Sequence, residues 1–296
     1  GSSAWAAPDG FEPSLSGDGR VVAYMHDPGW GSDTQVCVTT GWPEPGASGP
    51  GRLVRANLHV HTTASATLAS LLTHVDHGGC ESVYNTLTRA AQVGLNFVGI
   101  SDHAEAVTDT EWYDTIAITR GYQPDGLLSA TGFEWTYGQH MTDPQGSVFG
   151  RGYEHINVFG SNRKARANND GDGCGHGDLV PTLTDMYGWL ANADPAQRLY
   201  GAPVVAQFNH IYQGTHFGNF VKPGSPDGTP DFRERVRATM ALAELMVYPN
   251  DFAWASITDS EKYWQTALGN GWRVAPTIGA DNARIGTGGP LSQVHR

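Results

Sequence analysis

Two histidines in the run Asn57-Leu58-His59-Val60-His61 are spaced for metal binding. The run ends an apolar, strand-like stretch, and residues two apart in a strand point to the same side. His59 and His61 would therefore project together, and two neutral imidazoles on one face make half of a divalent-metal site. Taken alone, the pair is better explained as a chance pair on a solvated strand, so its meaning depends on the rest of the chain.

Metal-type side chains also lie in or beside nearly all the other apolar runs, close to their ends. They are, in chain order, Asp102 and His103, Glu134, His155, His210 and Asp281. Singly, each has another explanation: a turn and helix cap, a surface carboxylate, a hydrogen-bonded core histidine, a loop residue and a strand-end cap. Their recurrence at all but one of the predicted strand ends is hard to explain by chance. The set as a whole therefore indicates a metal site.

The apolar runs that carry these groups alternate with helical patterns from residue 55 onward. Strands are predicted at about 55–61, 96–102, 127–135, 153–160, 203–209, 241–248 and 273–280. Helices are predicted at about 80–93, 108–120, 182–193, 231–239 and 258–270, the last opened by a capping-box spacing at Thr258-Asp-Ser-Glu261. Seven strands joined mainly by helices predict an α/β fold whose parallel sheet closes as a distorted TIM-like barrel. All its strand ends would then meet on one face.

Residues 1–54 have a different character and are rich in Gly, Pro and Ser. Two strand-like runs, Arg20–Met25 and Thr34–Val38, lie on either side of the turn sequence Gly31-Ser32-Asp33. We therefore predict a small N-terminal β extension over residues 1–54, followed by the barrel over 55–296.

Composition restricts the partners. The chain has 18 basic and 30 acidic residues and a net charge of −12, which argues against a nucleic-acid polymer as partner. A small anionic substrate stays compatible, because bound metal ions would make the site locally positive. No apolar run approaches the roughly 20 residues that span a bilayer, so we expect no membrane partner. Cys37, Cys80 and Cys174 fit one disulfide or three thiols equally well, which leaves secreted, periplasmic and cytoplasmic locations open.

The series of motifs resembles the polymerase and histidinol phosphatase (PHP) family of metal-dependent hydrolases over residues of about 55 to 285. Asn57–Ser65 is similar to the first motif of that family, and Ile100–His103 is similar to its second. The later ligands of the family fall at Glu134, His155, His210 and Asp281. The resemblance implies a distorted (β/α)7 barrel. The sequences Asn-Leu-His-Val-His and Gly-Phe-Glu-Trp are most similar to the carbaryl-hydrolase (CehA/McbA) branch.

Two positions depart from the pattern of this family. Thr67 and Ala283 stand where it usually has histidines of a third metal site. We therefore expect two divalent ions (zinc, manganese or iron) rather than three, with His74 or His77 as the alternative source of a third-site ligand. By the resemblance, one ion is held by His59, His61, Glu134 and Asp281. Glu134 then bridges to a second ion, which is held by His155 and His210.

The resemblance implies hydrolysis of a small-molecule substrate by a metal-activated hydroxide. Asp281 is the candidate general base, and His103 is the candidate acid for the leaving group or stabiliser of the developing anion. Asp102 is the candidate partner that orients His103. A phosphoesterase acting on a small mono- or diester is the first hypothesis. A carbamate, ester or amide hydrolase with the same centre is the second, and a non-catalytic barrel braced by metals is the third.

The surroundings of the motifs do not choose between phosphate and carbonyl substrates. No basic cluster adjoins a ligand motif, although loop cations such as Arg163 and Lys164 could reach the site to grip a phosphate. Aromatic residues near the ligands, among them Trp135, Phe208 and Phe217, favour a pocket for an apolar group unless they only pack the core.

Overall fold

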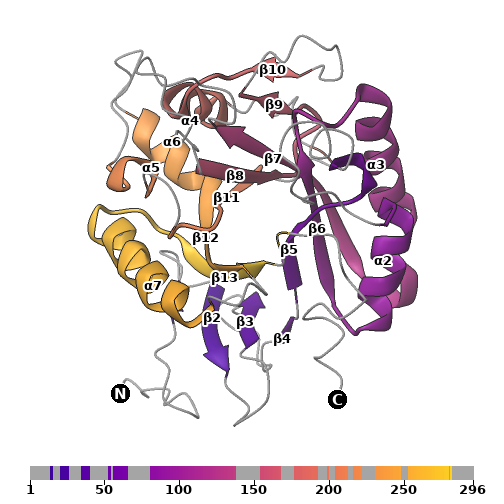
Figure 1. The fold of residues 1–296 in the computed structure, drawn as a ribbon, viewed down its shortest axis with the longest axis horizontal. Coiled ribbons are helices and arrows are strands. Elements are labelled where there is room, and N and C mark those ends of the chain that lie inside the picture. The colour runs from indigo at the N-terminus through magenta and orange to yellow at the C-terminus, as the bar shows by residue number, and fades with distance from the viewer. Residues whose placement is uncertain are drawn as a thin grey trace, which may run out of the picture.

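Figure 1 shows the fold of the chain as a computed structural model. The structure describes residues 14–15, 21–26, 35–40, 53–54, 56–65, 81–137, 154–167, 177–192, 199, 204–212, 216–221, 231–247, 253–279 and 281. Among these residues, strands form a central sheet of seven strands, a second sheet of four and a pair of two.

A curled seven-stranded sheet lies at the centre of the fold. Its strands follow the order β13-β12-β11-β8-β7-β6-β5. They are β5 (Ala56–Val60), β6 (Phe97–His103), β7 (Leu128–Tyr137), β8 (Glu154–Phe159), β11 (Val205–Phe208), β12 (Met240–Val247) and β13 (Ala275–Gly279). The sheet curls until β13 lies beside β5, and the backbone N–H of Asp281 donates to the carbonyl oxygen of His59 at 3.1 Å (Figure 1). The predicted α/β fold with a distorted barrel is confirmed, and each predicted strand is present.

The sheet is mixed, however, and the prediction of a fully parallel sheet is wrong at one strand. β8 runs antiparallel to both of its neighbours, β7 and β11, whereas the other neighbouring pairs are parallel. The sequence predicts no helix between β7 and β8, and antiparallel neighbours need no helical crossover. Because β8 is reversed, its amino end, with Glu154 and His155, lies at the rim where the other strands finish.

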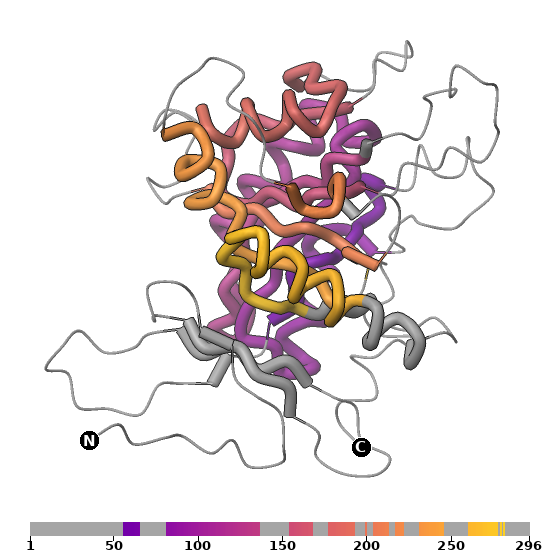
Figure 2. Tube along the Cα trace, turned by 90° about the vertical axis from the view of Figure 1, so that its left-hand side faces the viewer, coloured from indigo at the N-terminus to yellow at the C-terminus, as the bar shows by residue number. Residues whose placement is uncertain are grey.

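The described helices lie around the outside of the curled sheet (Figure 1). The longer ones are α2 (Val83–Gln92), α3 (Asp109–Gly121), α4 (Leu183–Ala191), α6 (Phe232–Thr239) and α7 (Ala253–Gly269). On one flank, α4, α6 and α7 lie one below another in the turned view of Figure 2. Each predicted helix is present, but α7 begins at Ala253, so Thr258 and Glu261 lie inside it. A spacing of three residues also occurs within helices, and here it is no start signal.

Local sequence explains how the elements begin. The N-terminus of α3 carries a capping box, in which the Thr108 side chain accepts from the backbone N–H of Glu111 and the Glu111 side chain accepts from that of Thr108. Short elements complete the fold: η1 (Thr63–Ser65), η2 (Pro124–Gly126), β9 (Ala165–Arg166), β10 (Asp178–Leu179) and α5 (His216–Asn219). Of these, η1 directly follows β5 and lies next to the candidate metal ligands.

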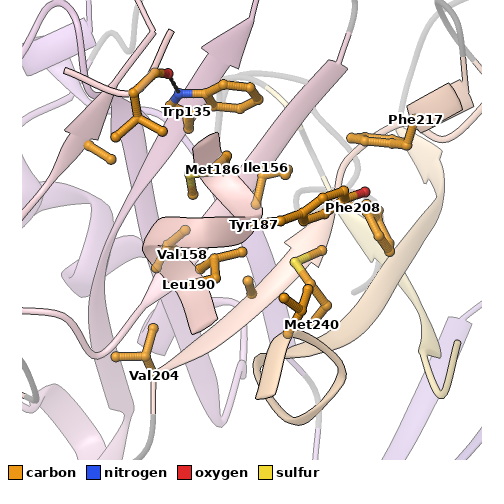
Figure 3. Packing of buried hydrophobic residues seen from close by; sticks show 14 of the residues in the cluster. Trp135, Ile156, Val158, Met186, Tyr187, Leu190, Val204, Phe208, Phe217 and Met240 are labelled. Atoms are coloured by element: carbon orange, nitrogen blue, oxygen red, sulfur yellow. Dashed lines mark hydrogen bonds between the residues drawn. The ribbon is translucent and has the colours of Figure 1, made fainter. Parts of the chain in front are cut away.

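Apolar side chains fill the space between the sheet and the helices. Figure 3 shows Trp135 and Ile156 of the sheet near Met186 and Tyr187 of α4, with the indole N–H of Trp135 donating to the carbonyl oxygen of Val180 at 2.9 Å. Three of the aromatic residues predicted near the ligands, Trp135, Phe208 and Phe217, are buried in this core. They pack the core, so they do not support an aromatic substrate pocket.

The inner side of the curled sheet is polar by contrast. Side chains alternate along each strand, so that Phe133 and Trp135 face the core and Glu134 faces inward. The same alternation places Asn157 and Gln207 inward on β8 and β11, both fully buried. Buried polar groups must be hydrogen-bonded or hold a ligand, so the inner side is where a site is expected.

The N-terminal part of the chain contains a four-stranded antiparallel sheet. Its strands are β1 (Ser14–Leu15), β2 (Val21–His26), β3 (Gln35–Thr40) and β4 (Leu53–Val54), in that order. The two predicted runs form β2 and β3, and the boundary at residue 54 stays a prediction. In the described part of the chain, no helix is both long and apolar enough to cross a membrane.

Candidate metal centre

Two groups of potential ligands lie at the rim of the curled sheet and share one residue. The first group consists of His59, His61, Glu134 and Asp281, and the second consists of Glu134, His155 and His210. Within each group the ligand atoms all lie within 4.8 Å of one another. The sequence predicts this grouping, including the shared Glu134.

The separations within the first group have the size expected around one ion. His59 Nε2 lies 3.2 Å from both Glu134 Oε1 and Asp281 Oδ1. His61 Nε2 lies 3.4 Å from Glu134 Oε2 and 3.3 Å from Asp281 Oδ1. Nitrogen and oxygen ligands about 2.0 to 2.2 Å from a tetrahedral ion are about 3.3 to 3.6 Å apart. The donor atoms are therefore already spaced like a ligand shell.

The second group is smaller and leaves room for other ligands. His155 Nδ1 lies 2.9 Å from Glu134 Oε1. His210 Nε2 lies 3.2 Å from His155 Nδ1 and 3.8 Å from Glu134 Oε1. Three protein ligands with an open position are the pattern of catalytic rather than structural zinc sites.

Two buried atoms between these side chains support a metal ion as the missing partner. His59 Nε2 and Glu134 Oε2 are buried and make no hydrogen bond among the described residues, although other ionisable groups lie close to them. A buried polar atom without a partner costs about 1–3 kcal/mol. An ion bound between them would satisfy both, so the residues fit a metal.

His59 of β5 and His61, which directly follows β5, are each held from the side away from the group. His59 Nδ1 lies 3.0 and 2.9 Å from the two carboxyl oxygens of Glu244, which is fully buried in β12. His61 Nδ1 lies 3.2 Å from Ser65 Oγ, and that hydroxyl donates to Asp102 at 2.6 Å. Each ring therefore turns its Nε2 toward Glu134 and keeps Nδ1 for a protein partner.

Glu134 is held by a chain of buried amides on the inner side of the sheet. Asn209 Nδ2 donates to Glu134 Oε1 at 2.7 Å and is also 2.8 Å from Asn157 Oδ1. Gln207 donates to Asn209 Oδ1 at 3.0 Å, and the Thr277 hydroxyl donates to Gln207 at 2.8 Å. This network fixes the orientation of the shared carboxyl group.

The backbone is unusual at two of the candidate ligands. His210 and Asp281 have φ angles of 30° and 45°, and each lies two residues beyond the last residue of a strand. Such angles are rare outside glycine and cost about 1–3 kcal/mol each unless the surroundings enforce them. Hydrogen bonds supply that enforcement: the N–H of His210 donates to Glu244 at 2.9 Å, and the N–H of Asp281 donates to the carbonyl oxygen of His59.

Charges within the first group favour ionised carboxyl groups. Burial opposes charge on Glu134, but His155, His59 and His103 outweigh it and hold its pKa well below the ordinary value. Burial likewise opposes charge on Asp281, and His59 and His61 lower its pKa. Burial also disfavours the charged form of His59, yet Glu244, Asp281 and Glu134 hold its pKa well above the ordinary value. A metal ion would take the place of the proton on His59 Nε2.

The pKa values of the other histidines around Glu134 do not all shift in the same direction. Burial lowers the pKa of His103 to about 3, helped by His61 and His155. Burial also lowers the pKa of His155, and Glu134 offsets part of that effect. Burial also disfavours the charged form of His210, but the nearby carboxyl groups of Glu134, Asp281 and Glu244 outweigh it, and the pKa rises. His103 is therefore neutral at physiological pH, which weakens the prediction that it acts as an imidazolium acid.

The side chain of Asp102 contacts Thr62 and Ser65 instead of the ring of His103, which it was predicted to orient. Its carboxyl group accepts from the N–H and hydroxyl of Thr62 at 2.6 and 2.7 Å and from Ser65. Adjacent residues of a strand point to opposite sides, so a direct contact between the two side chains is disfavoured. The ring partner of His103 is Thr136, whose hydroxyl lies 2.9 Å from Nδ1. Asp102 instead holds the turn that follows His61.

The group opens to solvent on one side. The side chains of Asp281, His103 and His155 are 22%, 13% and 12% exposed, whereas Glu134 is completely buried. Among the described residues of the two groups and His103, these three side chains are the ones most accessible to a substrate. His103 Nδ1 lies 3.0 Å from Glu134 Oε2, which places this ring at the border of the first group.

Several residues that bear on the sequence predictions lie outside the described part of the chain. They are Thr67, His74, His77, Cys80, Cys174 and Ala283, together with the side chain of Cys37. The prediction of two rather than three ions and the state of the cysteines therefore stay predictions. Sequence reasoning missed Glu244 and Asn209, which contact candidate ligands, and Thr136, which contacts His103. The signal for Glu244 is a single acidic residue in the apolar strand Met240–Val247, where burial of a lone carboxyl group is costly.

Comparisons with known proteins give little further information. No family model matches the chain, and no curated protein matches it. Among solved structures, the chain is similar to a "putative metal-dependent phosphoesterase" from Bifidobacterium adolescentis, with 15% sequence identity and a TM-score of 0.38. The match covers 79% of this chain and 89% of that one. A likeness this distant assigns no reaction to the chain.

Proposed function

We propose that this protein is a metal-dependent hydrolase with a two-ion centre. The observation that carries the proposal is the position of Glu134, a fully buried carboxyl group that belongs to both groups of potential ligands. His59, His61 and Asp281 would complete the first site, and His155 and His210 the second. Zinc, manganese and iron all suit this mixture of imidazole and carboxyl groups.

Bound ions would lower the pKa of a water molecule and polarise the bond to be cleaved. Asp281 is the best-placed general base, because it is the most exposed member of the first group and the nearby His59 and His61 keep its carboxyl group ionised. Its Oδ1 faces both His59 and His61, so a base at this position would act next to the activated water. Glu134 and its amide network would keep the two sites at a fixed spacing.

His103 is proposed to contact the substrate as a neutral ring. It borders the opening and is held by Thr136, so its free ring nitrogen can hydrogen-bond to a substrate oxygen or stabilise a developing anion. Because the pKa of this ring is about 3, proton donation to the leaving group is a poorer role for it at neutral pH.

The first candidate substrate is a small phosphate mono- or diester, the chemistry implied by the resemblance of the motifs to metal-dependent phosphoesterases. The second is a carbamate, ester or amide, and one observation favours it. Two cations expected to reach a phosphate are engaged elsewhere: Lys164 is buried and donates to the carbonyl oxygen of Val107 at 2.5 Å, and Arg163 pairs with Asp178. A phosphate pocket usually adds such cations to the metal ions.

The proposal is tested by loading the purified chain with zinc or manganese and assaying p-nitrophenyl phosphate, bis(p-nitrophenyl) phosphate and naphthyl carbamates. Hydrolysis of the phosphate esters is expected. Removal of the His59 imidazole in His59→Ala should abolish this hydrolysis. Asp114→Asn, an exposed change on α3, serves as the matched control and should leave the rate unchanged. Hydrolysis of the carbamates alone would select the second candidate. Equal rates in wild type and His59→Ala would contradict both.

A further inference from the structure

Glu244 is a buried carboxyl group on β12 that reaches both groups of potential ligands. Its two oxygens lie 3.0 and 2.9 Å from Nδ1 of His59, a member of the first group. One of them, Oε2, also accepts from the backbone N–H of His210 at 2.9 Å, and His210 belongs to the second group. The side chain is fully buried, so no contact with solvent or substrate accounts for it.

The contact with His59 fixes which ring nitrogen can bind an ion. Carboxyl oxygens act as acceptors toward a ring N–H, so the hydrogen of a neutral His59 ring is kept on Nδ1. The lone pair then lies on Nε2, the atom 3.2 Å from Glu134 and from Asp281. Carboxylate partners of this kind orient metal-binding histidines and raise their basicity.

The contact with His210 acts on the backbone instead of the ring. His210 has a φ of 30°, which few residues adopt without support, and its N–H donates to Glu244. The same carboxyl group therefore holds a ring of the first group and the backbone of the second. Loss of Glu244 should disturb both groups at once.

A glycine makes room for this side chain. Glu244 belongs to β12 and His59 to β5, and β13 lies between these strands. A Cβ atom at Gly279 of β13 would lie 1.8 Å from Glu244 Oε1 and 2.4 Å from His59 Cβ. Any side chain at this position would push Glu244 away from the ring. Gly279 is thus the second residue on which the arrangement depends.

We infer that Glu244 is a positioning residue that aligns one ligand of each metal site, His59 through its ring and His210 through its backbone, in space left by Gly279. The inference rests on the proposed two-ion centre. It concerns affinity for the ions rather than the chemical step, because Glu244 does not reach the opening of the site.

The experiment measures both metal dissociation constants by competition with a chromogenic chelator, in wild type, Glu244→Gln and Gly279→Ala. Each variant is expected to weaken both ions about 10- to 100-fold, the usual effect of losing such a partner. Glu105→Gln is the matched control for a buried glutamate. Glu105 Oε1 accepts from the backbone N–H groups of Ala167 and Thr136, and the amide oxygen of a glutamine can accept the same two bonds. Gly188→Ala is the control for glycine, since nothing lies within 4 Å of its Cβ position. Both controls should bind as wild type.

A second readout separates positioning from general stability. Nitrogen-15 NMR of the histidine rings at a pH that leaves His59 neutral should show its hydrogen on Nδ1 in wild type and a mixture of tautomers in Glu244→Gln. If Glu244→Gln does not fold, Gly279→Ala carries the same two measurements. Unchanged dissociation constants in a folded variant, or weakening of one ion only, would overturn the inference and leave the two-ion centre intact. A wild-type chain that binds no ion would instead overturn the proposed function.

Discussion

The backbone N–H of Asp281 donates to the carbonyl oxygen of His59 over 3.1 Å. This bond joins the segment after the last strand of the curled sheet to the first strand, and it places two potential ligands of the same group side by side. Their side chains meet as well, with His59 Nε2 3.2 Å from Asp281 Oδ1. The contact that closes the barrel therefore also brings together two members of the first group of potential ligands.

Replacement of Asp281 by asparagine should separate the role of its backbone in closing the barrel from the role of its carboxyl group in catalysis. Asparagine tolerates a positive φ better than most residues, so Asp281→Asn is expected to keep the backbone bond to His59. Loss of the base should lower kcat by about 100- to 10,000-fold. The measurement is steady-state hydrolysis of p-nitrophenyl phosphate, with the fold checked by circular dichroism. A kcat within a few-fold of wild type would show that another group is the base.

Asp102→Asn should affect stability and leave the pH–rate profile unchanged. The Asp102 carboxyl group accepts three hydrogen bonds from Thr62 and Ser65, and a neutral amide replaces charge-assisted bonds of about 1.5–3 kcal/mol each. In urea unfolding of the metal-free variant, the free energy of unfolding should fall by roughly the value of one such bond, about 1.5–3 kcal/mol. A shift of the pKa values in the kcat/KM profile would contradict this, because it would restore Asp102 as a partner of His103.

Asn209→Ala tests the amide network under the shared carboxyl group. The change removes the donor to Glu134 Oε1 and to Asn157 Oδ1, which leaves buried acceptors without that partner. The free energy of unfolding should fall by about 1–3 kcal/mol. Asn85→Ala, an exposed change on α2, is the control and should cost little. A stability equal to wild type would mean that water replaces the lost donor.

Glu105 should make the stability depend on pH. Burial raises the pKa of this carboxyl group to about 7, and Oε2 has no hydrogen-bond partner among the described residues. The folded state then holds a proton that the unfolded chain has lost, so stability should fall as pH rises from about 4.5 to about 7, by roughly 3 kcal/mol. Glu105→Gln should remove this part of the pH dependence in urea unfolding. Identical slopes for the two proteins would show that Glu105 titrates normally.

The candidate ligands can be predicted from the sequence because each stands in a short motif at the end of an apolar run. His59 and His61 share a strand face, and the remaining ligands lie in or next to strands that a barrel must bring together. The direction of β8 is harder to predict, since an apolar strand has the same pattern whichever way it runs. His155 reaches the rim in spite of this error, because it lies at the amino end of a reversed strand.

The partners of the ligands could not be predicted in the same way. Glu244 lies 185 residues from His59 in sequence, and Asn209 lies 75 residues from Glu134. Such contacts depend on the register between strands and on how far the sheet curls, and neither has a local signature. The neutral state of His103 also depends on burial and on two neighbouring histidines that only the folded chain supplies.

The most direct test of the two-ion centre is the number of zinc ions bound per chain, measured by mass spectrometry after dialysis. Wild type is expected to bind two ions. His155→Ala should bind one, and Glu134→Ala should bind fewer than one, because Glu134 belongs to both groups. Two ions on Glu134→Ala, or none on wild type, would contradict a centre built on this shared carboxyl group.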